Sequence, residues 1–201
     1  MQTHAQCDFI ATGYQRLLTF EVPGGGFSWF GSAPANKILT AYGLVEFRDM
    51  ARVYDVDPEV IARTSNWLIR QQQPDGGWKP DTQFINEGAT NRFNSDVLRI
   101  TAYIAWVLES VEYKGTAIER ARQFIEQHLD DKMDAYTLAI VANFSVEDRK
   151  DYELTQCALQ MLRNVAVEQN EFAWWTATET GVYATGDSAR SRQRDWRYGL
   201  F

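Results

Sequence analysis

The sequence predicts an all-α protein in which helical hairpins stand side by side along a curve. Three observations predict this fold class. Segments that are apolar on nearly every side alternate with segments that carry a single apolar stripe. The three apolar segments share a Thr-Ala-Tyr or Asp-Ala-Tyr triplet, at residues 40–42, 101–103 and 134–136. Two turns also repeat, Gly25-Gly26-Phe27 and Gly76-Gly77-Trp78. Such repetition is typical of stacked helical hairpins, each of which buries its apolar face on its neighbours.

Four amphipathic segments indicate an outer row of helices, because one face of each is apolar and the other is charged. They cover residues 8–20, 57–68, 116–129 and 154–165 approximately. Asp57 followed by Pro58 is typical of an N-cap and the first position of a helix. Thr116 with Glu119 has the spacing of a capping box.

Three apolar segments indicate an inner row of helices, at about residues 36–54, 95–108 and 135–141. A helix that is apolar on all sides is buried on most of them. An inner ring of such helices inside an outer ring of amphipathic ones accounts for the alternation. A plain solenoid is the alternative that the pattern leaves open, although its inner row would carry more polar residues.

Two connections contain the repeated turns. Residues 22–26 break the first helix, and Phe27, Trp29 and Phe30 follow in a predicted loop. Residues 71–94 begin with a second glycine turn, continue through Trp78 and end in a polar stretch without a period. This second connection is either a wall of an active site or only the link that a repeated architecture requires.

Composition narrows the classes of function. The formal net charge of −7 argues against a nucleic-acid partner, since such proteins usually have a basic surface. Cys7 and Cys157 form no CxxC pair and do not cluster with the two histidines, so we expect no metal site. The uncharged stretch at residues 135–146 is too short to span a bilayer. The first residues lack the pattern of a signal peptide.

The chain resembles the thioester-containing domain of the alpha-2-macroglobulin and complement family, and we expect a bacterial member. The resemblance is strongest over "GYQRLLTFEVPGGGFSWFG" (13–31), "NKILTAYGLVEF" (36–47) and "NWLIRQQQPDGGWKPD" (66–81), and weaker to about residue 187. It implies an α/α toroid, the ring of helical hairpins also found in terpenoid cyclases and protein prenyltransferases. We expect residues 1–187 to form an incomplete toroid, whose open edge favours self-association.

The chemistry implied by the resemblance needs a Cys-x-Glu-Gln motif, in which the Cys thiol and the Gln side chain form an internal thioester. After a protease cuts the parent protein, the thioester acylates an amine or a hydroxyl of the target. In the family this motif precedes the "GYQRLL" segment, and Cys7 in "AQCDF" does not match it. We therefore expect no thioester, catalytic residue or cofactor within this chain.

The resemblance also gives the polar loop a role. In the family, a residue of the loop that follows the DGG-aromatic turn approaches the thioester carbonyl. A His there favours transfer to hydroxyls, and an Asn favours direct attack by amines. The alignment places Asn86 at this position. An amide has no nitrogen that titrates near neutral pH, so it cannot act as an imidazole does. The alternative is that Asn86 only makes local turn hydrogen bonds.

Three further motifs have simpler explanations. Residues 130–134 spell DDxxD, a run that can hold Mg²⁺, but they lie between two helices, where N-capping and solvation explain them. Gln72, Gly76 and Trp78 match a Q-x-x-x-G-x-W repeat that stiffens helix connections in cyclases, and so supports fold rather than activity. The inner segments carry aromatic residues that suit core packing better than an isoprenoid pocket: Tyr42, Tyr103, Trp106 and Tyr136.

Residues 188–201 depart from the expected pattern. Another apolar helix should follow, but the sequence has four arginines, Arg190, Arg192, Arg194 and Arg197. We expect an exposed or disordered tail, either natural or a cloning or reading-frame artefact.

The sequence thus predicts a non-enzymatic part of a macroglobulin-like protease trap (an endopeptidase inhibitor), which works outside the cell or in the periplasm. Its expected partners are proteases or amine-bearing surfaces, reached through the longer parent protein. The alternatives are a toroidal enzyme of the terpenoid cyclase or prenyltransferase kind, and a toroid that only binds.

Overall fold

A computed structural model describes residues 4–82, 95–148 and 152–176. Its helices are α1 (His4–Leu18), α2 (Lys37–Met50), α3 (Pro58–Arg70), α5 (Val97–Ser110), α6 (Thr116–His128), α7 (Ala135–Asp148) and α8 (Tyr152–Asn164). Two short antiparallel hairpins pair β1 (Glu21–Val22) with β2 (Gly26–Phe27), and β3 (Val167–Gln169) with β4 (Phe172–Trp174). The all-α prediction is confirmed. The predicted tail at residues 188–201 lies outside the described residues.

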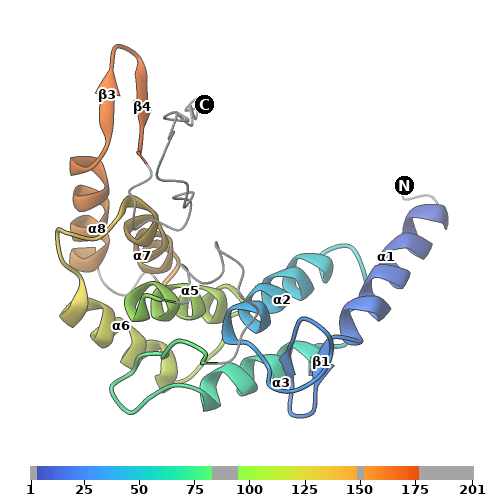
Figure 1. The fold of residues 1–201 in the computed structure, drawn as a ribbon. Coiled ribbons are helices and arrows are strands. Elements are labelled where there is room, and N and C mark those ends of the chain that lie inside the picture. The colour runs from blue at the N-terminus through green and yellow to red at the C-terminus, as the bar shows by residue number, and fades with distance from the viewer. Residues whose placement is uncertain (1–3, 83–94, 149–151, 177–201) are drawn as a thin grey trace, which may run out of the picture.

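The helices form two rows along an open arc (Figure 1). Helices α1, α3, α6 and α8 lie on the outside of the arc, and α2, α5 and α7 lie on the inside. The inner helices pack on one another, α2 on α5 and α5 on α7, and each also packs on an outer helix. Tyr42, Tyr103 and Tyr136 all belong to the inner row, as the repeated triplets predict.

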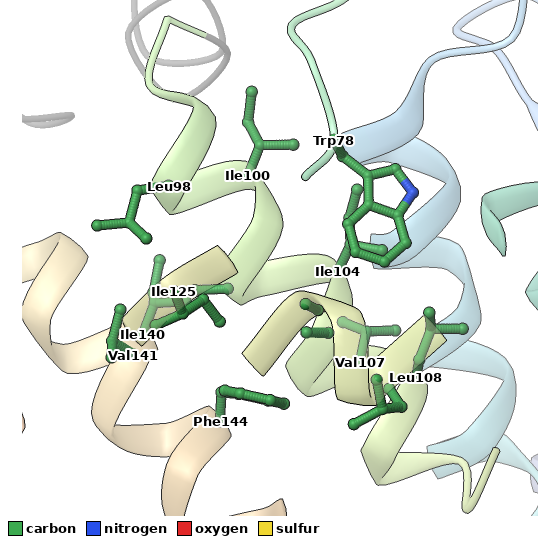
Figure 2. Packing of buried hydrophobic residues seen from close by; sticks show 14 of the residues in the cluster. Trp78, Leu98, Ile100, Ile104, Val107, Leu108, Ile125, Ile140, Val141 and Phe144 are labelled. Carbon is green, nitrogen blue, oxygen red and sulfur yellow. The ribbon is translucent and has the colours of Figure 1, made fainter. Parts of the chain in front are cut away.

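The core sits around α5, the most deeply buried helix. Ile100, Ile104 and Leu108 of this helix are fully buried because α2, α6 and α7 surround it. Figure 2 shows the cluster that α5 forms with Trp78, with Ile125 of α6 and with side chains of α7. Each large apolar side chain buried in this way stabilises the fold by about 1.5–3 kcal/mol.

The outer helices α3 and α6 each bury one stripe, as their amphipathic patterns predict, whereas α8 buries only Leu154 and Ala158. In α6 the stripe contains Ala117, Ile118, Ala121 and Ile125, all at most 1% exposed. Arg122 lies beside this stripe and is also buried, with its Nε 2.6 Å from Asp148 Oδ2 of α7. A buried pair of this kind fixes how α6 sits on α7, because either charge left alone there would be costly.

Each of the two glycine turns joins neighbouring hairpins through the same kind of contact. Gly25 and Gly76 have φ of +98° and +95°, and a Cβ on either would lie 2.6 or 2.3 Å from a backbone oxygen of the next outer helix. Those oxygens belong to Arg63 of α3 and Arg120 of α6. The turn backbone therefore lies directly on the helix that follows, which only glycine permits. We call this the turn-docking contact.

The next two residues of each turn also make equivalent contacts at both turns. A Cβ on Gly26 would meet the Trp67 ring at 2.5 Å, and one on Gly77 would meet the Phe124 ring at 2.9 Å. Trp67 and Phe124 each lie four residues, about one helical turn, after the arginine whose oxygen the preceding glycine approaches. The backbone N–H groups of the next residues, Phe27 and Trp78, donate to Thr40 Oγ1 at 2.8 Å and Thr101 Oγ1 at 3.0 Å of the inner helices α2 and α5. One turn thus joins an outer helix, the next inner helix and the next outer helix.

The structure corrects two local predictions. Thr116 does not form a capping box, because Gly115 is the N-cap residue and Thr116 the first residue of α6. Glu119 pairs with Arg122 at 2.9 Å instead. Phe27 lies in strand β2 rather than in a loop.

Substituting Gly76 by Ala should destabilise the protein by at least about 2 kcal/mol, since the new Cβ needs a strained φ and collides with the Arg120 carbonyl. Gly13→Ala is the matched control. Gly13 lies inside α1, and apart from its two chain neighbours and the backbone of its own helix, no atom lies within 4 Å of the point that an alanine methyl group would occupy. Alanine there should be neutral or stabilise by up to about 1 kcal/mol. Urea unfolding followed by circular dichroism measures both. Equal effects of the two substitutions would contradict the turn-docking contact.

Candidate functional site

The candidate site is the connection between α3 and α5, which contains Asn86. Asn86 itself and the rest of residues 83–94 lie outside the described residues, so its predicted role stays a prediction. The structure describes the two ends of this connection, residues 71–82 and 95–96, and what holds them. These anchors decide where the connection leaves the ring and where it returns.

Trp78 is the first anchor. Its side chain is fully buried, and its indole N–H donates to the backbone oxygen of Leu68, in the last turn of α3, at 2.7 Å. Gln72 supports the same turn, since its amide nitrogen donates to the carbonyl oxygens of Gly76 and of Ala117 at the start of α6. The Q-x-x-x-G-x-W residues therefore tie the connection to its neighbouring helices, as the sequence predicts.

Asp81 is the second anchor, and it ties the connection to the start of α2. One carboxylate oxygen accepts from the backbone N–H of Lys37 at 2.8 Å, and the other forms an ion pair with the Lys37 ammonium group. Both side chains are nearly buried, at 11% and 12% exposed. A carboxylate at a helix N-terminus is further favoured by the helix dipole. Asn36 completes this end by accepting from Leu39 N–H at 2.8 Å.

The connection returns at the start of α5, next to the start of α7. Asp96 caps α5 by accepting from the backbone N–H of Arg99 at 3.0 Å. The Arg99 side chain is 3% exposed and donates to Asp134 at 2.6 Å and to Thr137 at 2.8 Å. Asp134 in turn caps α7 by accepting from Thr137 N–H at 3.1 Å. The second end of the connection is therefore fixed by a charged network that joins two inner helices.

Burial is the largest single influence on the pKa of Asp134, and acting alone it would raise this pKa. Hydrogen bonds from Thr137 and the positive charge of Arg99 together outweigh burial, so the pKa of Asp134 lies below its ordinary value of 3.8. The carboxylate is therefore ionised at neutral pH and keeps Arg99 paired. This is the N-capping role that the sequence predicts for the last residue of the DDxxD run.

A cavity of about 500 Å³ opens beside this network. Its lining includes Asp96 and Arg99 of this network, His128 at the end of α6, and Lys132 and Met133 from the segment between α6 and α7. The His128 ring stacks on Phe124 at 4.0 Å, and its Nδ1 lies 2.8 Å from the Phe124 carbonyl oxygen. The cavity thus lies beside the start of α5, where the connection returns.

Within the described ranges, no group of three or more His, Cys, Asp or Glu side chains could hold a metal ion. No helix among the described residues has the length and apolar character that crossing a membrane needs. Of the aromatic residues on the inner row, Tyr42 is 54% exposed, while Tyr103 packs on Trp106 with ring centroids 5.9 Å apart. Burial, followed by the neighbouring Tyr136, Tyr42 and Glu46, raises the pKa of Tyr103.

Comparison with known proteins identifies the domain. A sequence model of the family described as "A-macroglobulin TED domain" matches residues 1–194. The chain belongs to this family. The resemblance to the alpha-2-macroglobulin and complement family is therefore confirmed, and the turn, the anchors and the connection are parts of a TED domain.

Two curated relatives are similar over most of the chain. Ovostatin of Gallus gallus is 27% identical over 173 residues, which cover 83% of this chain and 12% of ovostatin. Complement C3 of Lethenteron camtschaticum is 23% identical over 184 residues, which cover 86% of this chain and 11% of that protein. The chain thus spans about an eighth of the length of these relatives.

Sequence reasoning missed the second anchor and the charged network. Lys37 and Asp81 are 44 positions apart, and Arg99 and Asp134 are 35 apart, so no local pattern connects them. The one usable signal is that Asp96 and Asp134 stand directly before apolar helices, where a carboxylate is typical of an N-cap.

Asp134→Asn should destabilise the TED domain by about 3 kcal/mol at pH 7, because it removes the carboxylate that lies 2.6 Å from the buried Arg99, whose other paired carboxylate, that of Asp96, lies farther away at 3.8 Å. Since the pKa of Asp134 is lowered on folding, its charge stabilises the fold above pH 3.8, and this contribution is lost as pH falls through the folded-state pKa. The difference between wild type and variant in urea unfolding should therefore shrink below pH 3.8. A difference that stays constant with pH would contradict the role of this ion pair.

Proposed function

We propose that this TED domain is part of a macroglobulin-like protein that traps proteases, and that it acts without enzymatic turnover. The match of residues 1–194 to the A-macroglobulin TED family carries this proposal. The similarity to ovostatin, over 83% of the chain, and to complement C3, over 86%, supports a role within the macroglobulin and complement family. The described residues contribute a fixed frame, on which the connection between α3 and α5 is held at both ends.

In the proposed reaction, the nucleophile is an amine of the target, such as a lysine side chain. The amine nitrogen attacks the thioester carbonyl carbon, an amide bond forms, and the carbon–sulfur bond breaks. The thiolate leaves and takes up a proton, so that a free thiol remains. The thioester residues would come from the parent polypeptide, because neither Cys7 nor Cys157 stands in a Cys-x-Glu-Gln motif.

Asn86 would lie next to this carbonyl without acting as a base. The reactivity of each nucleophile would then decide which targets are acylated. A neutral amine attacks without help, whereas a hydroxyl needs a base to remove its proton. An amide side chain accepts and donates hydrogen bonds but takes up no proton near neutral pH. We therefore propose amine-bearing protein surfaces, proteases above all, as the partners of the parent protein.

The anchors give this proposal its structural basis. Trp78 and Asp81 hold the connection on α3 and α2, and Asp96 holds it on α5. Holding Asn86 in one geometry at the reacting carbonyl would be worth several kcal/mol in a reaction of two groups. A trap that acts on attacking proteases works where proteases are encountered, so we propose an extracellular or periplasmic location.

Methylamine treatment of the natural polypeptide that contains this chain tests the covalent trap. Intact mass spectrometry should show the gain of one methylamine, and thiol titration should show one newly free thiol. Prior alkylation of free thiols is the control, because it must not prevent the gain. If the mass and the thiol content of the polypeptide do not change, the covalent mechanism is wrong, although the family assignment still holds.

Replacing Asn86 by His in the same polypeptide tests the proposed role of the connection. An imidazole can act as a base and typically accelerates such transfers by about a hundredfold or more. Transfer to glycerol relative to methylamine, followed with radiolabelled acceptors, should rise by about that factor. Asn91→His, in the same connection, is the matched control and should leave the ratio unchanged. An equal response of both variants would argue against a special position for Asn86.

A further inference from the structure

The cavity beside the start of α5 is bounded by helices of two neighbouring hairpins, and its volume is about 500 Å³. Its lining comes from the first residues of α5, the last turns of α6 and the link that leads into α7. Helix α5 packs on both α6 and α7, so the walls are held in place by helix packing within the arc (Figure 1). Small-molecule sites in proteins commonly have volumes in this range. We call it the α5–α7 cavity.

One part of the lining is apolar. Phe124 is 5% exposed, and the His128 ring stacks on it with the two planes 17° apart. Val97 and Met133 are half-buried and add aliphatic and thioether atoms. An aromatic or aliphatic group that lies on these side chains is removed from water, which favours its binding.

Two charged groups of the lining satisfy each other. The Arg99 guanidinium is 3% exposed and donates to Asp134 Oδ2 at 2.6 Å. Asp134 also accepts from the Thr137 hydroxyl and from the backbone N–H groups of Tyr136 and Thr137. Both carboxylate oxygens of Asp134 are therefore occupied within the protein. The pair shapes the cavity but has little capacity left for a ligand.

Three other polar groups of the lining keep that capacity. Among the described residues, the ammonium group of the exposed Lys132 has no ion-pair partner. One oxygen of Asp96 caps α5, and the other lies 3.8 Å from Arg99, beyond hydrogen-bond distance. His128 Nδ1 donates to the Phe124 carbonyl oxygen, because a carbonyl only accepts, so Nε2 of the neutral ring is an acceptor. The cavity thus offers one cationic donor, one anionic acceptor and one neutral acceptor.

The formal charges of the lining indicate the class of ligand. Asp96 and Asp134 are negative and Arg99 and Lys132 are positive, so with a neutral His128 the lining has no net charge. An anion would suit Lys132 but would place a second negative charge near Asp96. A cation would have the opposite fault. A zwitterion meets both free charges with the opposite sign, which is the complementary arrangement.

We propose that the α5–α7 cavity binds a small zwitterion with an apolar side chain, of the size of a free aromatic amino acid. The ligand's carboxylate accepts from Lys132, and its ammonium group donates to Asp96 and His128. Its side chain lies on Phe124 and Met133. This inference is independent of the thioester chemistry, because it rests only on the lining of the cavity.

Nuclear magnetic resonance of the isotope-labelled 201-residue protein tests the site and the class of ligand. Three probes share a phenyl group: phenylalanine carries both charges, hydrocinnamate lacks the amine, and phenethylamine lacks the carboxylate. Phenylalanine should bind with a dissociation constant on the order of 1 mM and shift the backbone amide signals of residues 95–99 and 128–134. Each of the other two probes should bind about fivefold more weakly, because each loses one charged contact.

Lys132→Met separates the carboxylate contact from the rest of the site, because it removes the ammonium group and keeps a long side chain. It should weaken the binding of phenylalanine and hydrocinnamate about fivefold and should not weaken that of phenethylamine. Lys114→Met is the matched control, since Lys114 is exposed in the link between α5 and α6 and does not line the cavity. Circular dichroism should show the same helix content in both variants.

Three results would overturn the proposal. The first is a titration in which phenylalanine shifts no amide signal of the lining residues. The second is hydrocinnamate or phenethylamine binding as tightly as phenylalanine, which would indicate an anion site, a cation site or a merely apolar surface. The third is an equal effect of Lys132→Met and Lys114→Met on the binding of phenylalanine.

Discussion

The turn-docking contact is the constraint on which the rest of the structure depends. The backbone at Gly25 and Gly76 lies so close to the following outer helix that no Cβ fits between them. This close approach brings Phe27 and Trp78 onto the inner helices and sets how far each hairpin stands from the next. The apolar rows supply most of the free energy of folding, but any pair of apolar helices could pack in several ways. The glycine turns select one of them.

The turn-docking contact determines where the candidate site begins. Trp78 follows directly after the second turn, and Asp81 follows three residues later, so the connection leaves the ring at a defined point on α2. The return is held differently, by Asp96 and by the pairing of Arg99 with Asp134. The outgoing end therefore combines the apolar burial of Trp78 with the ion pair of Asp81 and Lys37, and the returning end depends on charged and polar side chains. Protonation of Asp134 in acid weakens the returning end, whereas the burial of Trp78 does not depend on pH.

The sequence predicts the rows of helices well, because long periodic segments become helices and α3, α5, α6 and α7 bury the faces that their patterns indicate. In α2 the prediction of burial on most sides is wrong, since Tyr42 is 54% exposed. It predicts the starts of helices less well. The N-cap at Asp57 with Pro58 is confirmed, but Thr116 is not a cap, since an extended Gly115 takes that position. The hairpin β3–β4 escapes prediction because its turn has Asn170 at φ +56° where the other turns have glycine. The ion pairs of the candidate site join residues far apart in the chain, so only the folded structure reveals them.

The repeated docking of turn on helix also bears on how such domains change their size over evolutionary time. Each hairpin meets only its neighbours, through contacts whose geometry is nearly the same at Gly25 and at Gly76. A gene duplication that copies one hairpin with its glycine turn therefore supplies both the surface it needs and the surface that the next unit needs. Loss of a terminal unit exposes only one such surface and leaves the remaining units intact. Lineages can thus lengthen or shorten the arc by whole units without redesigning its interior.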